Sequence, residues 1–207
     1  MTSSADTSEA DDRVVRMPLT RQAVISAARD MIVEVGHEAL SLRPLAARLG
    51  VTAAAMYAHV ENKHELLRAI AAERYNALAE LYEAIETDDP VEKIREIARL
   101  YLEDAHSNPE LFRVKFMFPP MLGDNDGKEG TVVGQRAFDI AVTAIEQAMD
   151  EGRLKKDDPI DVSFALWASV HGVAVFDLAS GNMDKAHRTR ILEIVMDNLI
   201  SGMGEKS

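Results

Sequence analysis

The sequence contains no cysteine. Disulfide bonds, thiolate catalysis and cysteine-ligated zinc or iron-sulfur sites are therefore excluded, and the absence fits a reducing compartment such as the cytoplasm. Residues 1–12 also lack the basic segment and the apolar run of a secretion signal, so none is expected. These residues hold four acidic side chains and no basic one. We predict a disordered acidic tail over residues 1–15.

Long apolar runs are scarce as well. One passage approaches the length of a membrane span, VSFALWASVHGVAVFDLA at residues 162–179. It contains a histidine, two serines and an aspartate, and it has no flanking cluster of basic residues. A buried core helix is therefore the favoured interpretation, and no membrane partner is expected.

Strand-like alternation of apolar and polar residues is absent. Apolar residues recur at helical spacing almost throughout, which predicts an all-α protein with about nine helices. A helix of roughly four turns that ends at Gly36, followed by two short helices separated by Gly50, is expected to form a helix-turn-helix domain over residues 16–63. Residues 64–207 are predicted to form a helical bundle for ligand binding and dimerisation.

The net charge of -12 is unevenly distributed along the chain. Residues 13–68 contain eight basic and five acidic side chains, a net charge of +3, while residues 1–12 carry -4 and the remainder carries -11. This asymmetry indicates a small module that faces phosphates, attached to a body that does not.

The stretch LGVTAAAMYAHVENKHELL, at residues 49–67, has the helix-turn-helix pattern. Gly50 suits the turn between crossed helices, and Thr52 supplies a polar N-cap for the helix that enters a major groove. Tyr57, His59 and Lys63 carry O–H, ring N–H and ammonium groups, which are donors to phosphate at the rim of that groove. The pattern predicts DNA binding.

Residues 41–67 resemble the N-terminal domain of the TetR family of bacterial transcriptional regulators. Their Leu-Gly-Val-Thr turn is followed by Met-Tyr-x-His-Val-x-x-Lys-x-x-Leu-Leu, in which Met56 stands where the family has leucine, while Lys63, Leu66 and Leu67 match. The resemblance implies a homodimer, a palindromic DNA operator, a small-molecule effector and a C-terminal domain of about six helices.

Alanines set this sequence apart from the family pattern. Ala53, Ala54 and Ala58 occupy positions where members often have glycine, proline or a basic residue. Alanine can contact a thymine methyl group but cannot hydrogen-bond to a base. We therefore expect modest, thymine-biased specificity, and we predict DNA contacts by the following set: Arg43, Thr52, Ala53, Ala55, Tyr57, His59 and Lys63.

SFALWASVHGVAVF, at residues 163–176, resembles the Trp-His-Gly signature of one C-terminal domain type in this family, through Trp167, His171 and Gly172. Aromatic residues at helical spacing are either plain core or the wall of a site for an apolar effector with a small polar handle, and His171 is either a satisfied core histidine or part of that wall. The ligand-binding prediction covers six residues: Tyr101, Phe112, Phe116, Phe138, Trp167 and His171.

The last two helices are predicted to form the dimer contact, because small residues allow close helix approach and an apolar stripe is left for a partner. The predicted contact residues are Ala168, Gly172, Val175, Ile191, Ile194, Val195 and Leu199. Packing within the chain is the alternative interpretation.

Two rival functions remain open. Three Glu-x-x-His matches, at Glu34, Glu61 and Glu103, are compatible with a carboxylate-bridged dimetal enzyme, but each falls at a helix end or turn, so we expect no metal, no cofactor and no enzymatic activity. The alanine-rich reading helix also leaves open an adaptor of the same fold that has lost DNA affinity. The favoured hypothesis is a repressor in which the effector changes the angle of the helix from Lys63 to about Glu86.

Overall fold

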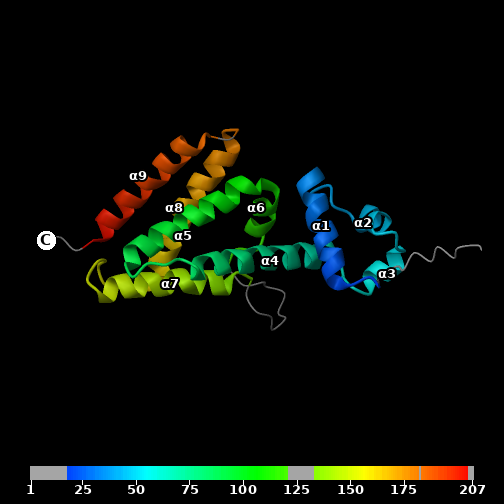
Figure 1. Ribbon diagram of the computed structural model, residues 1–207, viewed down its shortest axis with the longest axis horizontal. Coiled ribbons are helices and arrows are strands. Elements are labelled where there is room, and N and C mark those ends of the chain that lie inside the picture. The colour runs from blue at the N-terminus through cyan, green and yellow to red at the C-terminus, as the bar shows by residue number, and fades with distance from the viewer. Residues whose placement is uncertain (1–17, 121–132, 182, 205–207) are drawn as a thin grey trace, which may run out of the picture.

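The computed structural model describes residues 18–120, 133–181 and 183–204, and the predicted acidic tail lies outside these ranges. In this part of the chain the structure has nine α-helices and no strand, which confirms the predicted fold class (Figure 1). The helices are α1 (Arg21–Val35), α2 (Leu42–Arg48), α3 (Ala53–Tyr57), α4 (Lys63–Glu83), α5 (Pro90–Ser107), α6 (Pro109–Phe116), α7 (Gln135–Asp150), α8 (Pro159–Ala179) and α9 (Lys185–Met203).

Helices α1 to α3 form a small head at one end of the molecule (Figure 1). The Thr20 hydroxyl caps α1 by accepting from the Ala23 N–H at 3.1 Å, and Gly36, with φ of 81°, ends that helix as predicted. Ser41 is the N-cap residue of α2, but its side chain makes no capping hydrogen bond. The serine side chain therefore does not cap α2, although serine is a common N-cap residue.

The third helix ends at Tyr57 and leaves His59 in a turn. The Thr52 hydroxyl accepts from the Ala55 N–H at 3.2 Å and caps its start, as expected. Met56 is completely buried and fastens α3 to the head core.

Helix α4 belongs to both parts of the protein. Its first half contributes Leu66 and Ile70 to the head core, and its second half contributes Leu78 and Tyr82 to the core of the C-terminal bundle. Helix α6 has the same double role, because Leu111 packs in the head core whereas its neighbour Phe112 packs in the bundle. The two cores are therefore joined by shared helices rather than by a linker.

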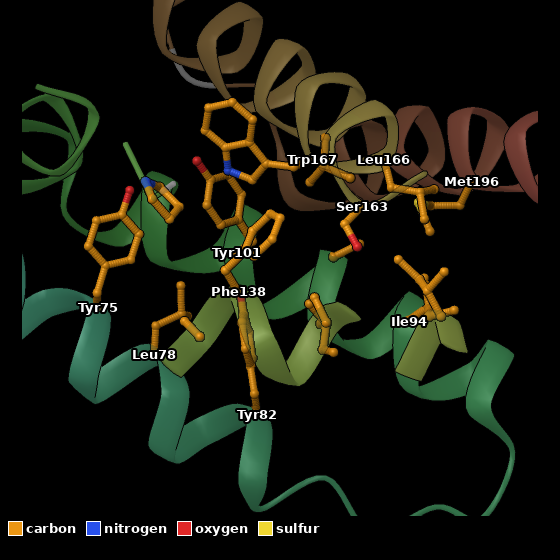
Figure 2. A pocket seen from close by; sticks show the side chains of 17 residues that line it. Tyr75, Leu78, Tyr82, Ile94, Tyr101, Phe138, Ser163, Leu166, Trp167 and Met196 are labelled. Atoms are coloured by element: carbon orange, nitrogen blue, oxygen red, sulfur yellow. The ribbon is translucent and has the colours of Figure 1, made fainter. Parts of the chain in front are cut away.

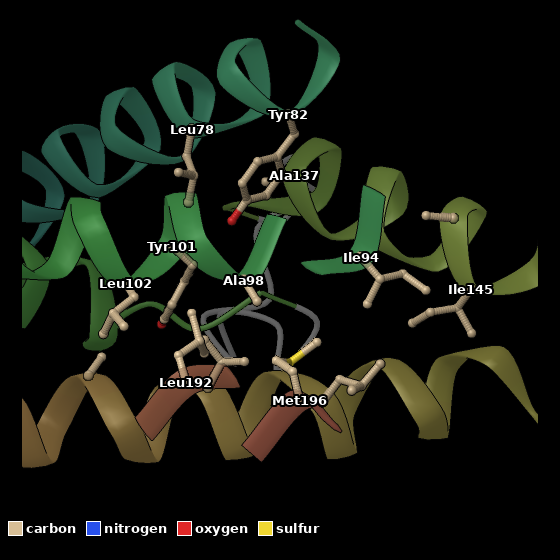
Figure 3. Packing of buried hydrophobic residues seen from close by; sticks show 14 of the residues in the cluster. Leu78, Tyr82, Ile94, Ala98, Tyr101, Leu102, Ala137, Ile145, Leu192 and Met196 are labelled. Atoms are coloured by element: carbon tan, nitrogen blue, oxygen red, sulfur yellow. The ribbon is translucent and has the colours of Figure 1, made fainter. Parts of the chain in front are cut away.

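The bundle is built around α5, which lies between α4 on one side and α8 and α9 on the other (Figure 3). Ala98 and Leu102 of α5 meet Leu192 and Met196 of α9 in this layer. Both α5 and α8 begin with an aspartate cap followed by proline, a combination that starts a helix efficiently.

Helix α8 is long and apolar enough to cross a membrane by length and composition alone, which is weak evidence because core helices meet the same criteria. It packs against α5, α7 and α9. Leu166, Val170 and Ala174 are buried in those contacts. One side of this helix thus lies in the core, as the sequence indicates, whereas Val175 and Phe176 of the same helix are exposed.

Candidate functional site

The exposed surface of α3 carries several of the predicted DNA contacts. Thr52 and Ala53 are exposed, Ala55 is half-buried, and the Tyr57 side chain is 60% exposed although it is a large aromatic group. Buried Met56 lies on the opposite side of the same short helix. The helix therefore presents a rigid surface of small residues with one projecting phenol.

Three further predicted contacts lie around α3. Arg43 is exposed on the first turn of α2, and His59 is half-buried in the turn after α3. The Lys63 ammonium, at the start of α4, donates to the Glu38 carbonyl oxygen at 2.9 Å. This bond uses one of its three N–H donors and leaves the others for a phosphate.

Ion pairs inside the head reduce the positive charge available to DNA. The Arg48 guanidinium donates to both carboxylate oxygens of Glu34, at 2.6 and 2.7 Å, and Arg21 pairs with Glu65. The hydrogen bond from Arg48 lowers the pKa of Glu34, so this carboxylate stays ionised. Net charge along the sequence does not reveal such pairing, because each partner is distant in the chain.

A cavity of ≈ 80 Å³ lies inside the C-terminal bundle, and we call it the bundle cavity. Helices α4, α5, α7, α8 and α9 contribute to its wall, which is almost wholly apolar (Figure 2). The residues that line it are Tyr75, Leu78, Tyr82, Ile94, Ile97, Ala98, Tyr101, Pro120, Ala137, Phe138, Ala141, Ile145, Ser163, Leu166, Trp167, Val170 and Met196.

Three of the six predicted ligand-binding residues, Tyr101, Phe138 and Trp167, line the bundle cavity. The prediction missed the contribution of α4, where Tyr75 and Tyr82 both face inward. A spacing of seven residues, two helical turns, was the available signal for these two tyrosines.

The other three predicted residues lie beside the cavity in an aromatic stack. The His171 ring stacks on Trp167 with centroids 5.0 Å apart, on Phe116 at 4.5 Å and on Phe112 at 5.4 Å. The Tyr101 hydroxyl and His171 Nδ1 are 2.9 Å apart. His171 therefore has a hydrogen-bond partner on Nδ1, while its Nε2 has none within the described residues.

A buried charge cluster that the sequence did not predict adjoins this stack. Lys115 of α6 is only 1% exposed, and its ammonium donates to Asp104 at 2.5 Å and lies 4.6 Å from the centroid of the Tyr101 ring. Asp104 also pairs with Arg74 of α4. Burial lowers the pKa of Lys115 while Asp104 opposes that effect, and burial together with Lys115 lowers the pKa of His171. A neutral imidazole is favoured at this position.

Comparison with known proteins identifies the family to which this chain belongs. Residues 24–70 match the family model described as "Bacterial regulatory proteins, tetR family", and residues 94–199, about half of the chain, match "Tetracyclin repressor-like, C-terminal domain". The chain belongs to the TetR family. The resemblance drawn from residues 41–67 is thereby confirmed, and Trp167, His171 and Gly172 fall within the range that matches the C-terminal domain.

Some similar TetR family proteins match this chain over most of its length, and others match only a short segment. The HTH-type transcriptional repressor AcnR of Corynebacterium diphtheriae is 26% identical over 89% of this chain and 94% of its own length. The tetracycline repressor protein class C of Escherichia coli is 49% identical, but over 26% of this chain and 24% of its own length. The match thus covers about a quarter of that relative. A crystal structure of a TetR variant from Acinetobacter baumannii AYE, in complex with minocycline, has a TM-score of 0.65 and 26% identity, over 89% of this chain and 96% of that chain.

The TetR family is a family of transcriptional regulators. In this member, the Glu-x-x-His matches do not come together to form a metal site. His37 lies 3.9 Å from Glu110, and His106 Nδ1 lies 3.0 Å from Asp177. Within residues 18–120, 133–181 and 183–204, no group of three His, Asp or Glu side chains is placed to hold a metal ion.

Helices α8 and α9 lie away from the DNA-binding head of this TetR family member (Figure 1). Of the predicted dimer contacts, Ala168, Gly172, Val175 and Ile194 are exposed, whereas Ile191, Val195 and Leu199 are partly buried against the core of their own chain. Phe176, which is 60% exposed, was not predicted and extends this apolar surface.

Proposed function

We propose that this TetR family protein is a cytoplasmic transcriptional repressor that binds a palindromic operator as a homodimer and releases it when a small, largely apolar effector enters the bundle cavity. One observation carries the proposal. Helix α4 begins at Lys63, beside the DNA-facing surface, and continues unbroken to Tyr75 and Tyr82 in the cavity wall. The two functions are thus built on one rigid element.

Operator binding is assigned to the head. Arg43, Tyr57, His59 and Lys63 donate to phosphates and supply most of the affinity. Base contacts from α3 are limited to the Thr52 hydroxyl and the methyl groups of the alanines, so each contributes little discrimination. The acidic remainder of the chain repels DNA and suppresses non-specific binding.

A homodimer is assigned to α8 and α9. Val175, Phe176 and Ile194 are large apolar side chains left 46%, 60% and 49% exposed by their own chain. Ala168 and Gly172 lie on the exposed side of α8 and permit close approach of a second copy. Two-fold symmetry would place the two copies of α3 about one turn of DNA, or a multiple of it, apart.

The switch follows from the size of the bundle cavity. A volume of ≈ 80 Å³ holds a few water molecules, whereas sites for small molecules usually measure about 300–1,000 Å³. An effector must therefore displace the cavity walls, and α4 is one of them. Movement of α4 changes the spacing of the two heads, and a coupling free energy of about 1–3 kcal/mol lowers operator affinity roughly 5- to 150-fold.

Footprinting on the DNA upstream of its own coding region tests the proposal. We expect a protected pseudo-palindrome, lost in Tyr57→Ala and kept in Leu81→Ala, a substitution of an exposed apolar residue of α4 outside the head. Sedimentation should show a dimer at micromolar concentration. Absence of protection by the folded wild-type dimer would contradict the assignment of operator binding.

A second candidate function is supported by the exposed alanines of α3, which have no side-chain hydrogen-bond donor. An adaptor of the same fold would bind an effector in the bundle cavity without binding DNA. Effector-dependent thermal stabilisation, combined with no protection of any upstream fragment, would favour that alternative.

A further inference from the structure

Two buried hydrogen-bond donors next to the bundle cavity lack partners. Trp167 Nε1 and His171 Nε2 are inaccessible to solvent and form no hydrogen bond within the described residues. Both residues lie on α8 one helical turn apart, and their rings stack with 20° between the planes. An unpaired buried N–H is unfavourable, so the pair indicates a place where an acceptor can bind.

The protonation state of His171 follows from its one hydrogen bond. If the Tyr101 hydroxyl donates to Nδ1, the neutral ring carries its proton on Nε2, and the hydroxyl proton is satisfied. The other tautomer would leave the hydroxyl proton and the Nε2 lone pair both unpaired, which is less favourable. Burial raises the pKa of the Tyr101 phenol well above its usual value, so this hydroxyl keeps its proton.

The indole N–H of Trp167 is close to the same phenol. Burial dominates the raised pKa of Tyr101, and a hydrogen-bonding contribution from the Trp167 indole opposes the rise. The N–H nevertheless does not meet the geometry of a hydrogen bond, and Nε1 remains without a partner. Figure 2 shows the indole of Trp167 next to the ring of Tyr101 among the residues that line the cavity. A ligand oxygen bound beside the stack would supply the acceptor that these two N–H groups lack in the described residues.

Charge around these donors disfavours a cation. Lys115 and Arg74 share the single carboxylate of Asp104 in the interior beside Tyr101. A second ammonium placed at the stack would lie near Lys115 and would face two N–H donors, which cannot accept a hydrogen bond from it. A carbonyl or carboxylate oxygen, in contrast, would accept hydrogen bonds from these donors and would be attracted by the nearby ammonium of Lys115.

We propose that the effector carries a carbonyl or carboxylate oxygen that accepts hydrogen bonds from Trp167 Nε1–H and His171 Nε2–H. This inference rests on the proposed function. The apolar body of the effector extends into the bundle cavity, whose wall Trp167 shares. The aromatic stack is thus the polar end of an otherwise apolar site, and it selects acids, esters or ketones against amines of the same shape.

The chain contains a single tryptophan, which gives the experiment a specific signal. In nitrogen-labelled protein its indole N–H gives one NMR resonance, which moves downfield when the group donates to an oxygen. Two matched sets of probes serve: octanoate, methyl octanoate and octylamine, and biphenyl carboxylate with biphenylmethylamine. We expect binding and a downfield shift with the acids and the ester, and neither with the amines.

Variants separate the donors from the apolar wall. Trp167→Phe and His171→Phe keep an aromatic ring but remove an N–H, and each should weaken binding of an acid about tenfold, which corresponds to about 1.4 kcal/mol. Phe138→Leu, at another part of the cavity wall, is the matched control and should weaken acids and esters alike without changing the indole shift.

Amines that bind as tightly as the acids, acids that bind without moving the indole resonance, or no binding of any acid at millimolar concentration would each overturn the inference. Operator binding is measured on the same samples. If the wild type does not bind the operator, only the proposed repressor function is contradicted. If it binds the operator but does not prefer acids and esters over amines, only this inference is contradicted.

Discussion

Lys63 offers a quantitative test of the DNA contacts assigned to the head. Its ammonium keeps two N–H donors beyond the bond to Glu38, and it lies at the start of α4 next to the turn that follows α3. Each phosphate contact contributes about 0.9 to the slope of log K against log salt concentration for duplex DNA. A dimer loses two such contacts in Lys63→Ala, so its slope should become shallower by about 1.8.

Arg48→Ala is the matched control, since it removes the same charge from the same domain. Arg48 is already bound to both oxygens of Glu34, and its loss should change the slope much less. Fluorescence anisotropy of labelled operator, titrated at several salt concentrations, measures both slopes. Equal changes in the two variants would mean that net charge, not a located contact, determines affinity, and an unchanged slope in Lys63→Ala would refute the assignment.

Four other substitutions test the fold and the cavity. Thr20→Ala should lower the free energy of unfolding by about 1 kcal/mol through loss of the α1 cap, while Ser41→Ala, whose side chain caps nothing, should leave it nearly unchanged in urea titrations. Ala98→Leu adds three carbons at the bundle cavity and should stabilise the protein by up to about 2 kcal/mol while abolishing effector release in the anisotropy assay; a lower melting temperature would show that the wall cannot accept them. Because the pKa of His171 is lowered in the folded protein, the unfolded chain binds more protons than the folded chain just below about pH 6.5, so stability falls as pH drops through that window. His171→Phe should reduce this fall in melting temperature. An equal fall in the variant and the wild type would contradict the reasoning.

The head was the part most accessible from the sequence, because its signals are local. Gly36 and Gly50 adopt positive φ, as expected of the residues that end α1 and follow α2. The caps of α1 and α3 need only a hydroxyl three residues from a backbone N–H. Ser41 is also a hydroxyl residue at an N-cap position, but its side chain makes no capping hydrogen bond. The direction of a side chain depends on its surroundings, which residue type alone does not report.

The site in the bundle was only partly predictable. Aromatic spacing on α5, α7 and α8 identified Tyr101, Phe138 and Trp167 as inward-facing, but it could not distinguish the lining of a cavity from filled core. Lys115 was missed because a lysine on a short helix is normally a solvated residue. Its burial depends on Asp104, which lies on a different helix.

The sharing of α4 and α6 between two cores has a consequence for dissection of the protein. Leu111, Val114 and Phe118, at most 5% exposed, belong to the core of the head although they follow α5 in the chain. A fragment ending with α4 would leave that core open where these side chains pack, and fragments that lack core contacts lose several kcal/mol against a total stability of only about 5–15 kcal/mol. We therefore predict that the head does not fold on its own, and that denaturation of the whole chain is one cooperative transition seen equally by probes in both cores.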